Sequence, residues 1–320
     1  MRNSIILLSI FLYNSLMVFA GNPEELGKVE WLRNYDLAIS KSKAVNKPVL
    51  ILFQEVPGCA TCRNYGHNVL SHPLMVEAIE NEFIPLAIYN NKAGKDAEVL
   101  KKYNEPSWNN PVVRIVNEKG ESIINRIASD YSAKGLCSGM ITALKKSGKS
   151  IPAYLNLLDE ELSADLLSNK KEAYYKMYCF WSGEKQLGSV TGVLNTESGF
   201  IGSAEIVKVT YNPQKVDEQT LQAFANKNAM EEVGENDGFK LATGDLHYYL
   251  QHSNYKYLPL SDLQKTKINS ALGRKVNAEI YLSPMQKKWL NDIQSSPEIY
   301  QVLFDKQIDK AWAIIEKTGL

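Results

Sequence analysis

The sequence is poor in cysteine and carries no excess of charge of either sign. Only four cysteines occur among 320 residues, whereas small scaffolds held together by disulfides are far richer in them. Lysine plus arginine and aspartate plus glutamate both number 36, so the formal net charge is zero. The chain has no basic stripe, acidic tail or long block of like charge, which argues against a nucleic-acid-binding protein. The few cysteines are better explained as working thiols than as structural crosslinks.

Long hydrophobic runs are absent beyond residue 20, so we expect no membrane span in the mature chain. Residues 1–20 have the pattern of a cleaved signal peptide. Arg2 supplies a positive charge, residues 5–12 are largely apolar, and Val18 and Ala20 occupy the small-residue positions before the cleavage point. The alternative is an uncleaved anchor, which needs an uninterrupted run of about 20 apolar residues. We therefore expect an exported protein, periplasmic or extracellular.

The length of the chain and its apolar pattern predict two domains. Hydrophobic residues make up 44% of the chain, which is enough for a core in each half, and a domain commonly holds roughly 100–200 residues. The polar stretch at residues 145–150 interrupts the apolar pattern. We place the boundary there, which gives a first domain at 21–148 and a second at 149–320.

The apolar pattern alternates between helical and extended segments. Residues 48–53 form a continuous apolar run, as expected for a strand buried on both faces. Helices are expected within 24–48 and at 75–83, 97–103 and 133–146, and strands at 83–89, 111–116 and 122–127. In the second half we expect strands at 173–178 and 205–210, and helices after Pro152, after the capping Asp217, at 260–273 and at 284–294. Such a mixture in the second half predicts an α+β domain.

Two of the cysteines, Cys59 and Cys62, follow the buried strand at the start of a helical stretch. Backbone N–H groups and the dipole at a helix start stabilise a thiolate on the first cysteine, and the second lies one turn on, within reach for a disulfide. We expect Cys59 to be the nucleophile and Cys62 the resolving thiol. The alternative is half of a zinc site, but that needs two further cysteine or histidine ligands, and the four histidines make no such motif.

The first half resembles the thioredoxin superfamily. The resemblance covers residues ~25–148 and is carried by the strand at 49–53, by Cys59 and Cys62, and by Pro111. It implies an α/β thioredoxin-like fold in which Pro111 is the cis-proline that lies against the disulfide and helps to bind the partner chain. The lead-in Val56-Pro57-Gly58 departs from the form usual in the family.

A third cysteine, Cys179, stands at the expected end of a strand and is followed by Phe180 and Trp181. A lone cysteine in a strand is usually a small core residue. An exposed, activated thiolate, however, attacks the sulfur of a sulfoxide when a nearby acid protonates the oxygen. The two aromatic rings would then hold the apolar methyl group of that substrate.

The second half resembles the A-type peptide methionine sulfoxide reductases over about residues 172–290. Cys-Phe-Trp at 179–181 and Ala-Glu-Ile-Val at 204–207 carry this resemblance. It implies an α+β plait related to ferredoxin-like folds, with Glu205 as the acid, Asp237 as a further active-site carboxylate and a preference for the S epimer. Tyr178 replaces the glycine of the signature, Ser203 replaces a histidine, and the resolving cysteines at the C-terminus are absent.

The missing resolving cysteines connect the two centres. Attack by Cys179 on methionine sulfoxide leaves a sulfenic acid, which another thiol must reduce. We expect Cys59 to attack this sulfenic acid and Cys62 to resolve the mixed disulfide, because a tether raises the effective thiol concentration. Cys137, within the helix at 133–146, is read as a buried bystander.

The resulting prediction is an exported enzyme that reduces methionine sulfoxide, free or in proteins, without a cofactor or metal. An upstream thiol reductant, such as a membrane thiol reductase, has to supply its electrons. The alternative is a thiol–disulfide oxidoreductase whose second domain is a non-catalytic module that binds clients. The tyrosine that the resemblance implies before Glu205 has no clear match, and Ala242 lies where another active-site tyrosine is expected. Retained Cys179 and Glu205 favour the first function, and these lost tyrosines favour the second.

Overall fold

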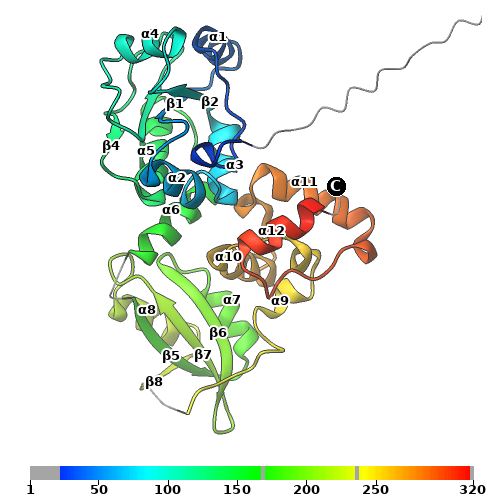
Figure 1. Ribbon diagram of the computed structural model, residues 1–320. Coiled ribbons are helices and arrows are strands. Elements are labelled where there is room, and N and C mark those ends of the chain that lie inside the picture. Colours follow the sequence, from blue (N-terminus) through cyan, green and yellow to red (C-terminus); the bar gives the residue numbers. More distant parts are fainter. Residues whose placement is uncertain (1–21, 167–169, 235–237, 318–320) are drawn as a thin grey trace, which may run out of the picture.

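The protein is described by a computed structural model for residues 22–166, 170–234 and 238–317. It contains two β-sheets, and a group of C-terminal helices lies alongside both of them (Figure 1). The expected signal peptide at 1–20 and the expected carboxylate Asp237 lie outside the described residues. Within the described ranges, no helix combines the length and apolar character needed to cross a membrane.

The first sheet has four strands in the order β2-β1-β3-β4. β1 (Val49–Gln54) pairs in parallel with β2 (Ile84–Tyr89) and antiparallel with β3 (Val112–Val116), which pairs antiparallel with β4 (Ile127–Ala128). All six residues of β1 are buried, as the apolar run predicts. The strand that leads to Cys59 is therefore the central, most enclosed part of the sheet.

Side chains of β1 alternate between two helical layers. Val49, Ile51 and Phe53 pack in one core cluster with α1 and α4, whereas Leu50 and Leu52 pack in another with α2, α3 and α5. This alternation is the period of two that a strand imposes on its side chains. The helices are α1 (Tyr35–Val45), α2 (Ala60–Asn68), α3 (Pro73–Glu82), α4 (Lys95–Lys102) and α5 (Ala133–Lys146).

Two expectations for this half are wrong in detail. A short 3-10 helix spans Glu24–Leu26. The first α-helix begins only at Tyr35, where the side chain of Asn34 accepts the N–H of Leu37, while Leu32 is extended and pairs with Leu86. The segment 122–127 is not a regular strand. Ile123 and Ile124 both pack against the core, which adjacent residues of a strand do not do, because their side chains point to opposite faces.

The second sheet is antiparallel throughout, in the order β8-β5-β7-β6-β9. Asp217 caps α8 by accepting the N–H of Thr220 at 2.7 Å, as predicted. An antiparallel sheet with helices agrees with an α+β domain, whereas the ferredoxin-like plait stays a prediction. The elements are β5 (Lys171–Met177), β6 (Val193–Ile201), β7 (Ala204–Tyr211), β8 (Glu231–Val233), β9 (Lys240–Leu241), α7 (Phe180–Leu187) and α8 (Glu218–Lys227).

The segment after Cys179, in which the sequence shows only scattered glycines, forms α7 and β6. Gly183 marks a close approach of α7 to β5, because a Cβ atom at this position would lie 1.9 Å from Sδ of Met177. Gly183, which interrupts the helical pattern of the sequence, therefore allows α7 to lie directly on the sheet. This contact places Cys179 at the junction of strand and helix.

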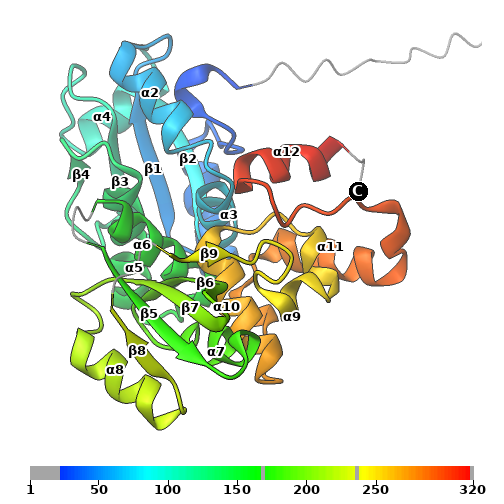
Figure 2. The same cartoon turned by 90° about the horizontal axis from the view of Figure 1, so that it is seen from below.

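The C-terminal helices connect the two sheets. Figures 1 and 2 show α9 to α12, coloured yellow to red, beside both of them. Trp289 and Trp312 share a core cluster with α3 and α5, and the buried carboxylate of Glu77 accepts the N–H of Met285 at 2.8 Å. The domain boundary at residue 148 stays a prediction. The C-terminal helices are α9 (Tyr248–Gln251), α10 (Asp262–Gly273), α11 (Pro284–Ser295) and α12 (Ile308–Lys317). Helix α6 (Ala153–Asp165) precedes the second sheet in the chain.

Candidate functional site

Cys59 is the N-cap residue of α2 and makes no capping bond with its side chain. The thiol is exposed, while that of Cys62, one turn further, is fully buried. The two Sγ atoms lie 3.6 Å apart and both residues are free thiols. A disulfide needs only a short closing movement from this geometry, since its S–S bond is about 2.05 Å.

The two thiols of this pair have opposite acidities. The backbone N–H of Cys62 lowers the pKa of Cys59 below the usual thiol value, against a smaller opposing effect of burial. Burial raises the pKa of Cys62 to about 11, and its hydrogen bond with Cys59 adds to the shift. Since the thiolate is the attacking form, Cys59 is the more readily activated of the two thiols, in the order that the sequence predicts.

The loop that carries Pro111 lies against the pair. The Asn110–Pro111 peptide bond is cis, as the thioredoxin resemblance implies. The thiol of Cys62 donates to Oδ1 of Asn110 at 2.7 Å. Behind the pair, the buried carboxylate of Glu25 accepts the N–H of Gly58 at 2.7 Å, a contact that the sequence does not reveal.

A third polar side chain, that of Glu55, reaches the same centre. A carboxylate oxygen of Glu55 and the Sγ atoms of Cys59 and Cys62 all lie within 4.8 Å of one another. Among the described residues, this is the one group of three such side chains close enough to hold a metal ion.

Cys179 occupies the same kind of position in the second sheet. It is the N-cap residue of α7, directly after β5, and again makes no capping bond with its side chain. Oε2 of Glu205, from β7, accepts the N–H of Phe180 at 2.8 Å. The structure therefore brings Glu205 to the helix start beside Cys179, as the resemblance implies.

The aromatic residues after Cys179 have different surroundings. Phe180 is buried in the core of the second sheet, with its ring 5.3 Å from that of Phe200. Trp181 is half-buried and stacks on Tyr248 of α9, with ring centroids 4.0 Å apart. Its indole N–H donates to Asp245 at 3.0 Å. Of the two rings, only Trp181 lies at the surface of the site.

Tyr248 and its neighbour Tyr249 are site residues that the sequence reasoning misses. Tyr248 stacks on Trp181, and the ring centroid of Tyr249 lies 5.6 Å from that of Tyr248. Burial raises the pKa of Tyr249, and the charge of Cys179 raises it further. The resemblance leaves Ala242 where an active-site tyrosine is expected. The Tyr-Tyr pair a few residues later is the signal that points to a substitute.

A buried carboxyl group joins α7 to the turn before α9. Glu184 is fully buried, and its Oε1 accepts the N–H of His247 at 3.3 Å. His247 itself is buried in the left-handed conformation, with φ at 47°. Burial raises the pKa of Glu184 to about 8 despite hydrogen bonds from backbone N–H groups, of which that of His247 has the largest effect. Glu184 thereby fixes where Tyr248 and Tyr249 lie relative to Cys179.

The fourth cysteine takes no part in either centre. Cys137 is fully buried in α5, and burial raises the pKa of its thiol to about 12. Its Sγ faces the carbonyl oxygen of Leu155 at 3.9 Å. A buried, neutral thiol is a poor nucleophile, which fits the bystander role.

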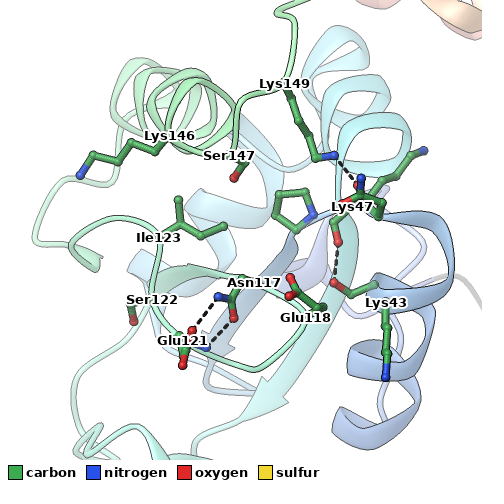
Figure 3. Close-up of a pocket in the computed structure, with 13 residues that line it drawn as sticks. Lys43, Lys47, Asn117, Glu118, Glu121, Ser122, Ile123, Lys146, Ser147 and Lys149 are labelled. Carbon is green, nitrogen blue, oxygen red and sulfur yellow. Dashed lines mark hydrogen bonds between the residues drawn. The ribbon is translucent and has the colours of Figure 1, made fainter.

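A cavity of about 820 Å³ lies at the other end of the first sheet. Figure 3 shows the residues that line it. Lys43, Lys47 and Lys149 line it together with Glu118. Pro48, which precedes β1, also lines it, whereas Cys59 follows β1. None of the predicted site residues lines this cavity.

The two thiol centres lie on separate parts of the molecule. Both Figure 1 and Figure 2 show α2 and α7 well apart, with α2 beside the first sheet and α7 beside the second. The structure therefore does not bring Cys59 and Cys179 together.

Part of the first half matches a known protein family. Residues 30–118 match the family described as thioredoxin-like. The first domain is thioredoxin-like. A solved structure named DsbH Oxidoreductase is 16% identical, with a TM-score of 0.33, over 39% of this chain and 90% of that chain.

A second match concerns the peptide methionine sulfoxide reductase MsrA of Methanococcus maripaludis (strain C5 / ATCC BAA-1333). The two proteins are 33% identical over 67 residues, which cover 16% of this chain and 43% of the relative. The chain thus spans less than half the length of this curated relative. Both resemblances seen in the sequence are confirmed, and together they support a thiol oxidoreductase.

The opposite acidities of the first pair predict selective alkylation. When iodoacetamide is added in less than stoichiometric amount to the reduced protein near neutral pH, Cys59 should be modified well before Cys62 and Cys137. The reason is that the pKa of Cys59 is lowered while the pKa values of the other two are raised to about 11 and about 12. Peptide mass spectrometry identifies the modified residue. Equal modification of Cys59 and Cys62 would contradict the assignment.

The buried Glu184 predicts a specific pH dependence of stability. Its pKa is about 8 in the folded protein and about 4.3 in the unfolded chain. Between these values only the folded state keeps the proton, so the stability that the neutral carboxyl contributes is present at low pH and is lost as the pH rises towards 8. Glu184→Gln, which does not titrate, should therefore gain stability relative to the wild type by up to a few kcal/mol between about pH 5 and about pH 8.

Urea unfolding of both proteins at the two pH values measures this difference. Glu231→Gln, at an exposed position, is the control and should follow the wild type at both. A difference between wild type and Glu184→Gln that does not change with pH would show that Glu184 is already ionised in the folded state.

Proposed function

We propose that this protein is an exported thiol oxidoreductase that reduces methionine sulfoxide at Cys179 and is regenerated by Cys59 and Cys62. The observation that carries the proposal is the grouping of Cys179, Glu205 and Trp181 at the start of α7, where Tyr248 stacks on Trp181. The partial match to MsrA supports the same chemistry. The proposed export rests on the signal-peptide pattern of residues 1–20.

In the first step, the thiolate of Cys179 attacks the sulfur of methionine sulfoxide. The oxygen passes to the cysteine sulfur, methionine leaves, and Cys179 becomes a sulfenic acid. The sulfoxide oxygen becomes more basic as the attack proceeds, so a proton donor lowers the barrier. In this proposal Glu205, whose side chain accepts the N–H of Phe180 next to Cys179, holds this proton, and Trp181 offers an apolar surface for the methyl group.

In the second step, the thiolate of Cys59 attacks the sulfenic acid of Cys179 and water leaves. Cys62 then attacks Cys59 in the mixed disulfide, which releases the Cys179 thiol and forms the Cys59–Cys62 disulfide. An external dithiol of the upstream reductant has to return two electrons and two protons to this disulfide. Because α2 and α7 lie apart, the transfer takes place after a rearrangement within one molecule or between two molecules.

The second candidate function is disulfide exchange at Cys59 with a second domain that only binds client proteins. Two observations favour it. The stacked ring of Tyr248 covers one face of Trp181, which leaves less of the indole for a methyl group. Tyr178 beside Cys179 is 98% exposed, as a client-binding residue would be.

Reduction of methionine sulfoxide by the reduced full-length protein separates these functions. The wild type should convert the substrate, and Cys179→Ser should lose roughly a thousandfold or more of the rate, because it removes the nucleophile. Cys137→Ser is the matched control and should retain the activity. An inactive wild type that still reduces protein disulfides would favour the second function.

A trapped intermediate tests the regeneration step in the same experiment. Cys62→Ser should accumulate a disulfide between Cys59 and Cys179 after exposure to methionine sulfoxide. A linked dimer would identify transfer between molecules, and a crosslink within a monomer would identify a rearrangement. If neither forms while Cys179 is oxidised, another reductant regenerates Cys179.

A further inference from the structure

The loop before α2 folds back on itself and brings a carboxylate to the thiol pair. β1 ends at Gln54, whose amide donates to the carbonyl oxygen of Cys62 at 3.2 Å and to that of Glu25 at 2.7 Å. Gly58 permits the tight return: a Cβ atom there would lie 2.4 Å from the carbonyl oxygen of Glu55 and 2.7 Å from Cβ of Cys62. The backbone of the loop therefore holds Glu55 beside the two cysteines.

From this arrangement we infer that the reduced Cys59–Cys62 pair and Glu55 form a binding site for a thiophilic divalent cation of the zinc type. All three ligand atoms lie within 4.8 Å of one another. Zinc binds thiolates at about 2.3 Å and carboxylates at about 2.0–2.2 Å, in a tetrahedron. Two sulfur ligands at that bond length lie about 3.8 Å apart, close to the 3.6 Å between the two Sγ atoms.

Among cysteine and histidine, the sequence shows no further ligand for a metal held by Cys59 and Cys62. Glu55 supplies a third ligand of another type, which the spacing of the cysteines does not reveal. Cys59 is exposed, so solvent reaches the fourth position. Two thiolates, one carboxylate and one water complete a zinc coordination sphere with an exchangeable position.

Binding exchanges two protons for one divalent cation. The thiols of Cys59 and Cys62 lose their protons, two metal–sulfur bonds form, and no electron is transferred. The loaded pair has no free thiolate, so it does not attack a disulfide or a sulfenic acid. When the ion dissociates, the metal-free pair gives two electrons to a disulfide or a sulfenic acid and becomes the Cys59–Cys62 disulfide, which has no thiolate left to bind the ion. The site therefore links metal occupancy to the redox state of the same two residues.

Cobalt(II) is the probe for this site, because its thiolate complexes absorb strongly in the near ultraviolet. The reduced full-length protein should bind one Co²⁺ with thiolate-to-cobalt charge-transfer absorption, and Zn²⁺ should displace it. The oxidised protein and Cys59→Ser should show no such absorption. Glu55→Gln, which keeps the size of the side chain but is a poor ligand, should bind Co²⁺ roughly tenfold or more weakly, since loss of even outer-shell support costs about that much.

Glu24→Gln is the matched control, because Glu24 is an exposed carboxylate that pairs with Arg63 of α2, the helix that also carries Cys62. Its affinity for Co²⁺ should equal that of the wild type. Glu55→Asp, which keeps the charge but withdraws the carboxylate by one methylene, should also weaken binding, and circular dichroism checks that each variant is folded. Absence of charge-transfer absorption, or equal affinity in wild type and both Glu55 variants, would overturn the assignment.

Activity measurements complete the test. Zn²⁺ should inhibit disulfide reduction by the wild type at lower concentrations than it inhibits Glu55→Gln. Metal binding is measured without methionine sulfoxide, so its failure would leave the proposed reductase function intact. Failure of that function would likewise leave the metal site intact.

Discussion

The chemistry of this protein depends on one local constraint, which is a cysteine placed where a strand passes into a helix. Cys59 follows β1 and begins α2, and Cys179 follows β5 and begins α7. The first turn of a helix has backbone N–H groups without helical partners, which favour negative charge. In neither case does the cysteine side chain make a capping bond. The sulfur atom is thus left available for reaction.

The two helix starts differ in how their N–H groups are used. At α2, the N–H of Cys62 acts on the sulfur of Cys59 and lowers its pKa. At α7, the carboxylate of Glu205 accepts the N–H of Phe180. The first arrangement favours the thiolate form of Cys59, which is the form that reacts in disulfide exchange. The second brings a carboxyl group to the helix start beside Cys179, and the proposed reduction of a sulfoxide depends on that group.

The second centre is assembled from several elements, and Glu184 connects two of them. Its buried carboxyl group holds the turn at His247, and so sets the positions of Tyr248 and Tyr249 against α7. These two tyrosines come from a different place in the chain than the tyrosine that the resemblance expects at Ala242. Burying a carboxyl group costs free energy, and its neutral form near pH 7 reduces that cost.

The sequence predicts the elements that have strong periodic patterns and misses those set by tertiary contacts. Strand β1 is predicted from its continuous apolar run, and helix α5 from apolar residues at helical spacing. Helix α7 is missed because Gly183 serves close packing on Met177 and breaks the pattern. Cys59, Cys62 and Cys179 are predictable from local spacing. Glu55 and Glu184 are not, because only the folded chain brings Glu55 to the thiols and Glu184 to the turn at His247.

The central claim is that Cys179 takes the oxygen from a sulfoxide, and one measurement tests it directly. A variant with both Cys59→Ser and Cys62→Ser has no partner to reduce the sulfenic acid. After one exposure to methionine sulfoxide, dimedone, which labels sulfenic acids, should attach to Cys179, and one methionine should form per protein molecule. Peptide mass spectrometry locates the label. Absence of methionine, or a label on Cys137 alone, would contradict the account.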